Sequence, residues 1–189
     1  MNQQARLAVV AILTAQAVMA AIMTMTPVHI AHQGGSITTI GITISLHVAG
    51  MYALSPLVGL VADRGGHRIA IGAGITIFLT SLIFGAVKPH DTTWLIAALI
   101  LLGVGWSFVN VTGSALFSAV VSPATRASSQ GGVDALSNLC GAAAALVAGP
   151  LLVVSGFSVL SILAIGALIP LTVLLVARPV TAQPIAVLE

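Results

Sequence analysis

Long apolar segments with almost no charge follow one another along most of this chain, and they limit what it can fold into. The sequence is 58% hydrophobic and only 5% charged over its 189 residues. Soluble domains carry about 25% charged residues, so the chain lacks the surface that a water-soluble protein needs. A helix that crosses a membrane needs about 20 apolar residues, and these segments reach that length. The sequence therefore predicts an all-α integral membrane protein.

Polar residues, glycines and prolines divide the apolar segments into six expected transmembrane helices within a single domain, residues 1–189. Pro27 is expected to end the first helix, and Ser122 followed by Pro123 is typical of the start of the fifth. The expected helices span residues 6–28, 37–62, 68–87, 93–120, 123–154 and 157–177.

The basic residues predict how the helices are oriented. With the N-terminus in the cytoplasm, five arginines fall on the cytoplasmic side and only Lys88 falls outside. This matches the excess of Lys and Arg that cytoplasmic loops carry. We therefore expect a multi-pass membrane protein with both termini in the cytoplasm. The five arginines are Arg6, Arg64, Arg68, Arg126 and Arg178.

Several other classes of function find no support in the residues. The few basic side chains are spread singly, so no patch for nucleic acid is expected. Cys140 is the single cysteine, which leaves neither a disulfide framework nor a thiolate metal site. No ATP-binding loop is present, and no nucleophile motif surrounds Ser114, which disfavours a hydrolase built with His47 and Asp134. No metal site and no cofactor are expected.

Residues 59–68 read Gly-Leu-Val-Ala-Asp-Arg-Gly-Gly-His-Arg and place charge and glycine in a short turn. This turn resembles the signature loop of the major facilitator superfamily, approximately Gly-x-Leu-Ala-Asp-Arg-x-Gly-Arg-Lys. It also lies where that family has it, after the second expected helix on the expected cytoplasmic side. Val61 replaces the leucine, and His67 replaces the first basic residue. The matching positions are Gly59, Ala62, Asp63, Arg64, Gly66 and Arg68.

The resemblance implies a secondary transporter in which two six-helix halves rock around a central site. The fourth expected helix lacks the arginine that the N-terminal half of this family usually carries, so the chain looks like the C-terminal half. The expected partners are the lipid bilayer, a small-molecule substrate and a second six-helix half. That half is a second copy, a separate N-terminal half or part of a longer native chain. The alternative is a truncated, transport-inactive membrane protein that acts at most in assembly.

The signature loop also implies a conformational latch, a contact that holds one state of the transport cycle. Asp63 would pair with an arginine or with the positive end of a neighbouring helix, and Arg126 is the best candidate in this chain. Gly59 and Gly66 are expected to allow a close helix approach and a tight turn. The simpler interpretation is that Asp63 and Arg64 are interfacial charges that fix the topology.

Two ionisable residues inside expected helices are candidates for proton coupling. His47 lies near the middle of the second helix, and ionisable groups at that depth are expected to be functional. Histidine exchanges protons near neutral pH, but a neutral, hydrogen-bonded imidazole is the alternative. Asp134 lies on the fifth helix, where structural pairing near the cytoplasmic interface competes with a role in coupling.

A mixed polar and aromatic face predicts a substrate cavity. Substrate sites in transporters combine apolar walls with a few polar groups near mid-membrane. The alternative is hydrogen bonding between helices, which contributes about 0.6 kcal/mol per contact in membranes. Import, export and the identity of the substrate stay open. The candidate cavity residues are Gln16, Thr43, Trp106, Asn110 and Ser114.

Overall fold

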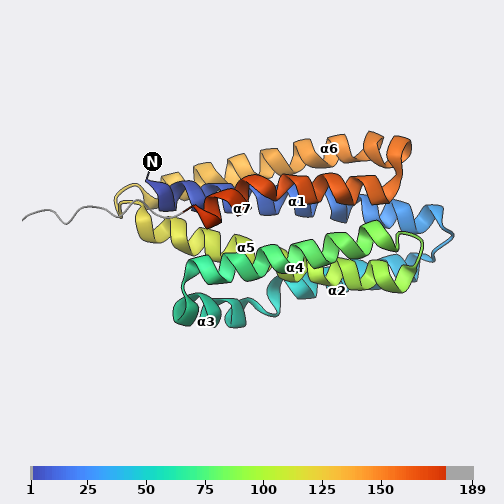
Figure 1. Cartoon of the computed structure of the whole chain (residues 1–189), viewed down its shortest axis with the longest axis horizontal. Helices are drawn as coiled ribbons and strands as arrows, with labels where there is room; N and C mark the ends of the chain where they lie inside the picture. The colour runs from blue at the N-terminus through green and yellow to red at the C-terminus, as the bar shows by residue number, and fades with distance from the viewer. Residues whose placement is uncertain (1, 178–189) are drawn as a thin grey trace, which may run out of the picture.

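The computed structural model describes residues 2–177, and its elements are helices that lie side by side along one long axis (Figure 1). The chain reverses direction at both ends of this bundle. The helices of the described part are α1 (Gln3–His32), α2 (Ile37–Tyr52), α3 (Ser55–Gly65), α4 (His67–Val87), α5 (Thr92–Val120), α6 (Arg126–Ala167) and α7 (Ile169–Val176).

The core of the bundle forms where α1 packs against α5 and α6, and where α5 packs against α4 and α2. Its largest buried side chains are aliphatic or aromatic, and they come from all of the long helices. Examples are Ile12 of α1, Phe78 of α4 and Leu102 of α5, each no more than 1% exposed. The packing leaves many large apolar side chains on the outside, including Leu146, Val153 and Val154. A bundle with this exterior matches a lipid environment.

The first helix does not end at Pro27 as expected; it continues to His32. Proline removes one backbone donor, but membrane helices tolerate this loss when neighbouring groups satisfy the freed carbonyl. Buried residues on both sides of the proline, Ile22 and Ile30, fix the helix against the core. Tertiary packing therefore overrides the local preference of proline to end a helix.

The expected second helix, 37–62, is divided into α2 and α3. Ala53 ends α2, and Leu54 precedes α3, whose first turn contains Pro56. Because Pro56 has no backbone N–H to donate to the carbonyl of Tyr52 and its ring clashes with that carbonyl, the helix breaks here. Such interrupted helices occur in transporters at the level of the substrate.

The fifth and sixth expected helices belong to one long element, α6, with an interruption at Gly156. The backbone of Gly156 has φ 77° and ψ 173°, a conformation that favours glycine. There the chain turns back on itself, so that residues 126–155 and 157–167 form two antiparallel arms (Figure 1). The second arm continues into α7 after Leu168, at a break beside Pro170. We call residues 126–155 and 157–167 the first and second arms of α6.

The first arm begins at Arg126, three residues later than the expected start at Pro123. Ser122 does not cap it; its carbonyl accepts a hydrogen bond from the backbone N–H of Thr125 at 3.1 Å. This bond closes a turn between α5 and α6. The local signal of serine followed by proline therefore produces a turn here instead of a helix start.

Five helical stretches within the described residues have the length and composition to cross a membrane. The last of them contains 51 residues, which is about 75 Å of helix and more than twice a hydrocarbon core of about 30 Å. The five stretches are Gln3–His32, Ile37–Gly65, His67–Val87, Thr92–Val120 and Arg126–Val176.

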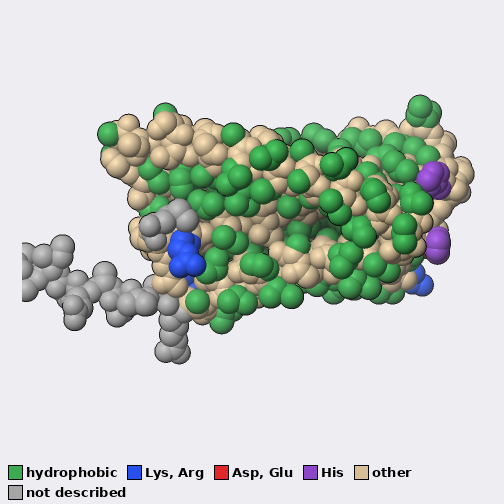
Figure 2. Space-filling model, turned by 90° about the horizontal axis from the view of Figure 1, so that it is seen from above, with side chains coloured by type: hydrophobic (Ala, Val, Ile, Leu, Met, Phe, Trp, Pro, Cys, Tyr) green, Lys and Arg blue, Asp and Glu red, His purple; other side chains and the backbone are tan. Residues whose placement is uncertain are grey.

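Charged side chains gather at the two ends of the bundle. Figure 2 shows one face whose middle is hydrophobic, with Lys or Arg side chains at both ends and histidines at one. The start of α1, the α3–α4 turn and the start of α6 share one end, which carries Arg6, Arg64, Arg68 and Arg126. Lys88 lies in the α4–α5 turn at the other end. Arg178 lies outside the described residues.

Candidate functional site

The signature loop, residues 59–68, forms the end of α3 and the start of α4. Gly66 connects the two helices with φ 86°, which places it in the region that only glycine adopts readily. Gly59 makes no close helix contact, because no atom of the described chain lies within 4 Å of where its Cβ would be. The tight turn expected at Gly66 is therefore present, and the close approach expected at Gly59 is not.

The charges of the loop have different surroundings. Asp63 and Arg64 are exposed, and neither forms an ion pair within residues 2–177. Arg126 is also exposed and does not reach Asp63. Arg68 instead donates hydrogen bonds to the backbone carbonyls of Leu175 and Ala177, the second at 3.1 Å. Its guanidinium satisfies carbonyls at the negative end of α7, a contact that the sequence did not predict.

His47 is completely buried between α2 and α5. Its Nδ1 lies 2.8 Å from the carbonyl oxygen of Leu99, and because a carbonyl only accepts, Nδ1 donates this bond. The other ring nitrogen, Nε2, is buried without a partner among the described residues. Thr43 lies one turn earlier on the same buried face and bonds to the carbonyl of Thr39 at 2.7 Å. His47 therefore presents one free proton acceptor inside the bundle.

Asp134 is exposed on the first arm of α6, two turns after Arg126. One of its carboxylate oxygens accepts a hydrogen bond from the Gln130 side chain at 3.1 Å. At 1.5 Å per residue it lies about 12 Å along the arm. Asp134 and His47 belong to different parts of the bundle, and the structure does not bring them into contact.

A chain of polar side chains crosses three helices and includes two of the expected cavity residues. Trp106 of α5 donates its indole N–H to Gln16 of α1 at 3.1 Å. The Gln16 amide in turn donates to the side-chain oxygen of Asn138 on the first arm of α6, at 3.4 Å. We call these three residues the polar bridge. Each lies near the middle of its helix, so the polar bridge sits halfway along the bundle.

Further polar and aromatic side chains lie next to the polar bridge, one on α2 and two along α5. Tyr52, at the end of α2, is 60% exposed and meets Trp106 edge to face with ring centroids 6.1 Å apart. Asn110 and Ser114 follow Trp106 at intervals of four along α5, and both are half-buried. The expected stripe on α5 therefore borders the bridge. Thr43 faces the α2–α5 contact instead.

Sequence reasoning did not single out Asn138 or Tyr52. Asn138 is a polar residue in an otherwise small and apolar part of α6, and this signal alone would have made it a candidate. Tyr52 is the single tyrosine of the chain, yet its approach to Trp106 depends on the break between α2 and α3. The identity of the residues was visible in the sequence, but their proximity was not.

A second polar cluster lies at the opposite end from the signature loop. The Gln33 amide nitrogen lies 2.7 Å from His29 Nε2, 3.1 Å from His90 Nδ1 and 2.9 Å from the carbonyl oxygen of Pro89. His29 also stacks on Phe157, at the start of the second arm of α6, with ring centroids 4.8 Å apart. This cluster fastens the end of α1 to the α4–α5 turn and to the Gly156 reversal.

The charge-free middle of the bundle and its membrane-length helices define a multi-pass membrane protein. The sequence comparison identifies its family: the chain belongs to the Major Facilitator Superfamily, whose family model matches residues 7–187. This is a family of transporters and not of enzymes. The resemblance of the signature loop is confirmed by this match.

Individual relatives are similar over most of this chain. The Uncharacterized MFS-type transporter YddS of Bacillus subtilis (strain 168) is 44% identical over 155 residues, covering 81% of this chain and 35% of that protein. The Uncharacterized MFS-type transporter YdeG of the same organism is 41% identical over 165 residues, covering 87% and 38%. The Riboflavin transporter RfnT of Brucella anthropi is 30% identical over 155 residues, covering 82% and 39%. The chain thus spans less than half the length of these relatives.

Proposed function

We propose that this chain is one half of a secondary transporter that moves a small molecule across a membrane by alternating access. The observation that carries this proposal is the polar bridge of Trp106, Gln16 and Asn138, which joins three apolar helices near their middles. Transporters bind substrate near the bilayer midplane, where a few polar groups stand among apolar walls and interrupted helices. The break between α2 and α3 lies beside the bridge, through the contact of Tyr52 with Trp106.

Six crossings of the membrane follow from this proposal. The crossings are α1, α2 with α3, α4, α5, the first arm of α6, and the second arm with α7. The arginine-rich end of the bundle is then cytoplasmic, in agreement with the preference of cytoplasmic loops for basic residues. The described chain begins and ends at that end of the bundle, so cytoplasmic termini and a bacterial inner membrane are part of the proposal.

A second six-helix half would cover the face that carries the polar bridge. Asn138 is exposed at mid-height in the bundle, and Tyr52 is exposed beside Trp106. Polar groups at this depth avoid lipid and face a bundle interior or a water-filled cavity. This chain spans 35% and 38% of its two Bacillus relatives. In this proposal a second copy, a separate N-terminal half or the rest of a longer native chain completes the cavity.

The residues of the bridge favour an uncharged substrate. Gln16, Asn138 and Asn110 offer amide donors and acceptors, while Trp106 and Tyr52 offer aromatic faces and edges. No Lys, Arg, Asp or Glu joins them within the described contacts. We propose a neutral, hydrogen-bonding molecule with a flat ring system, and the name of the relative RfnT makes riboflavin the first probe.

An ion gradient is proposed to drive the cycle. His47 has a buried, unpartnered Nε2 atom that could accept a proton if the cycle admits water. Asp134 is a second candidate, because its exposed carboxylate has only an uncharged partner, Gln130. The latch would use Asp63, which is exposed and without an ion-pair partner within residues 2–177, so its partner belongs to the second half.

Binding at the polar bridge is tested by fluorescence. The sequence contains two tryptophans, so Trp94→Phe leaves Trp106 as the single reporter in this chain. We expect riboflavin, or another flat neutral molecule from a panel, to quench Trp106 saturably. Gln16→Leu should weaken that binding, whereas the matched control Gln33→Leu, at the end of the bundle, should leave it intact. If both variants weaken binding equally, the polar bridge is not part of the binding site.

A truncated, transport-inactive membrane protein that acts at most in assembly is the second candidate. Immunoblots of native membranes with an antibody to the C-terminal segment, with crosslinking in parallel, separate the cases. A band at the size of this chain that crosslinks to twice that size supports a dimer of halves. A larger band that survives denaturation means that these residues are part of a complete transporter. An uncrosslinked small band without pH-driven uptake supports the inactive product.

A further inference from the structure

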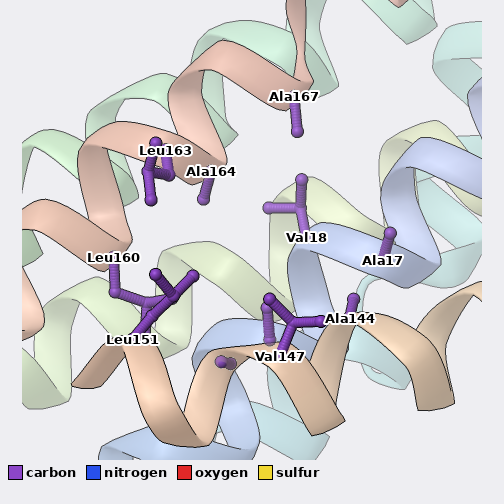
Figure 3. Close-up of a pocket in the computed structure, with 11 residues that line it drawn as sticks. Ala17, Val18, Ala144, Val147, Leu151, Leu160, Leu163, Ala164 and Ala167 are labelled. Atoms are coloured by element: carbon purple, nitrogen blue, oxygen red, sulfur yellow. The ribbon is translucent and has the colours of Figure 1, made fainter. Parts of the chain in front are cut away.

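An apolar crevice of about 250 Å³ lies where α1 meets both arms of α6 (Figure 3). All 11 residues that line it are alanine, valine or leucine. Its inner wall is buried, with Val18 and Ala148 each 2% exposed, whereas Val147 and Leu163 are 57% and 50% exposed. The crevice is thus a hydrocarbon-lined space that opens onto the outer surface of the bundle.

Small side chains that face one another produce this space. Ala148 and Ala164 lie at equal distances in sequence from Gly156, so the reversal brings them opposite each other, and both line the crevice. Ala144 and Ala167 continue the two walls one turn farther from the reversal. Because alanines meet alanines, the arms leave a gap that longer side chains would fill.

In the proposed topology, the crevice lies at the depth of the hydrocarbon core. Residues 160–167 are about 6 to 16 Å along the second arm from the Gly156 reversal, at 1.5 Å per residue. Ala17 and Val18 lie in the middle of α1. Water has no polar partner among the lining residues, and apolar cavities of this kind stay dry. In the membrane topology proposed above, the opening faces lipid.

We propose that a phospholipid acyl chain, from the leaflet on the side of the Gly156 reversal, binds in this crevice. Apolar cavities of about 150 Å³ already accept a molecule of the size of benzene, so the larger crevice takes a longer hydrocarbon segment. A helix of a partner protein is about 10 Å wide and does not enter it. The proposal depends on the membrane topology proposed above, but it does not depend on transport.

The physical basis of this binding is packing. Lipid tails are as apolar as the crevice, so transfer out of water contributes nothing to the preference. A seated chain gains dispersion contacts with walls on several sides, whereas a chain on a flat helix surface has contacts on one side only. The seated chain would also contact α1 and both arms of α6 at once.

The test uses a phosphatidylcholine with a photoactivatable diazirine in the middle of one acyl chain. The protein is reconstituted in vesicles containing this lipid and illuminated, and the crosslinked peptides are mapped by mass spectrometry. We expect label to concentrate on residues 144–151 and 160–167. It should exceed the label at Val153 and Val154, which are more exposed at 81% and 84%. Label that simply follows exposure would overturn the proposal.

Variants that fill the crevice sharpen the test. Ala164→Leu fills the inner space, and Ala167→Leu narrows the exposed rim, where an added side chain does not disturb the core. Each should reduce label at the crevice several-fold, whereas the control Ala142→Leu, exposed on the first arm and outside the crevice, should not. Unchanged label in Ala167→Leu contradicts the proposal even if Ala164→Leu fails to fold. Loss of riboflavin binding or of transport would leave this result unaffected.

Discussion

Gly103 of α5 lies directly against His47 of α2: a Cβ at Gly103 would overlap the carbonyl oxygen of His47 and would lie 3.2 Å from its Nδ1. The same contact brings Nδ1 within hydrogen-bonding distance of Leu99, one turn earlier on α5. Gly103 therefore determines how closely α2 packs against α5, and this close packing buries His47. Small residues serve this purpose widely in membrane helix packing.

Replacing Gly103 should separate the two helices. We expect Gly103→Ala to lower the free energy of unfolding by about 1 to 3 kcal/mol, because the added methyl group meets the backbone of α2. Gly41→Ala on α2 is the matched control, since nothing lies within 4 Å of its Cβ position. Thermal unfolding in detergent measures both, and a Gly103→Ala protein as stable as the control would mean that the contact is looser than described.

Replacing His47 should change the coupling of transport to the pH gradient without changing the thermal stability of the protein. His47→Leu removes one hydrogen bond, worth about 0.6 kcal/mol in membranes, and it also removes a buried nitrogen that has no partner. We therefore expect nearly unchanged thermal stability and a loss of pH-driven uptake in vesicles. Uptake that keeps its full dependence on the pH gradient would assign His47 a structural role and direct attention to Asp134.

Replacing Asp63 should affect cycling more than folding. The carboxylate is exposed and forms no ion pair within residues 2–177, so Asp63→Asn leaves the described contacts unchanged. We expect normal insertion, scored by the amount of protein in the membrane, together with slower uptake in vesicles. If insertion and uptake fall by the same factor, the latch hypothesis is wrong and the residue acts in folding or topology.

Two arginines of the signature loop should behave differently. Arg68→Gln removes the donor to the carbonyls of Leu175 and Ala177 and should lower the free energy of unfolding by about 1 kcal/mol. Arg64→Gln is the matched control, because Arg64 is exposed and makes no ion pair among the described residues. Hydrogen exchange of residues 169–176 should increase in Arg68→Gln alone. Equal exchange in both variants would show that the end of α7 does not need Arg68.

The cluster around Gln33 should restrain local opening of the α4–α5 turn. Gln33→Leu removes the donor that contacts Pro89 and His90, so we expect faster hydrogen exchange in residues 88–93. Gln16→Leu is the control, because it makes the same substitution in the middle of the bundle. If the turn exchanges at the same rate in Gln33→Leu as in the unsubstituted protein, the cluster does not restrain it.

Local features of the sequence determined the membrane class, the approximate helices and the signature turn. Apolar length and low charge depend only on composition along the chain, and Gly66 is the residue type that tolerates the positive φ of a tight turn. The same reasoning failed at Pro27 and at Ser122, because each is a local signal that packing or a turn hydrogen bond overrides. It also predicted one helix where Pro56 gives two.

Tertiary structure decided which side chains meet. Gln16 lies 90 residues from Trp106 and 122 residues from Asn138, and no spacing in the sequence brings them together. The same is true of Arg68 and Ala177, 109 residues apart. These contacts depend on how each helix is rotated about its axis and how closely glycines and alanines let neighbours approach. The composition of each segment determines that it forms a helix. The packing between helices determines which of their faces come into contact.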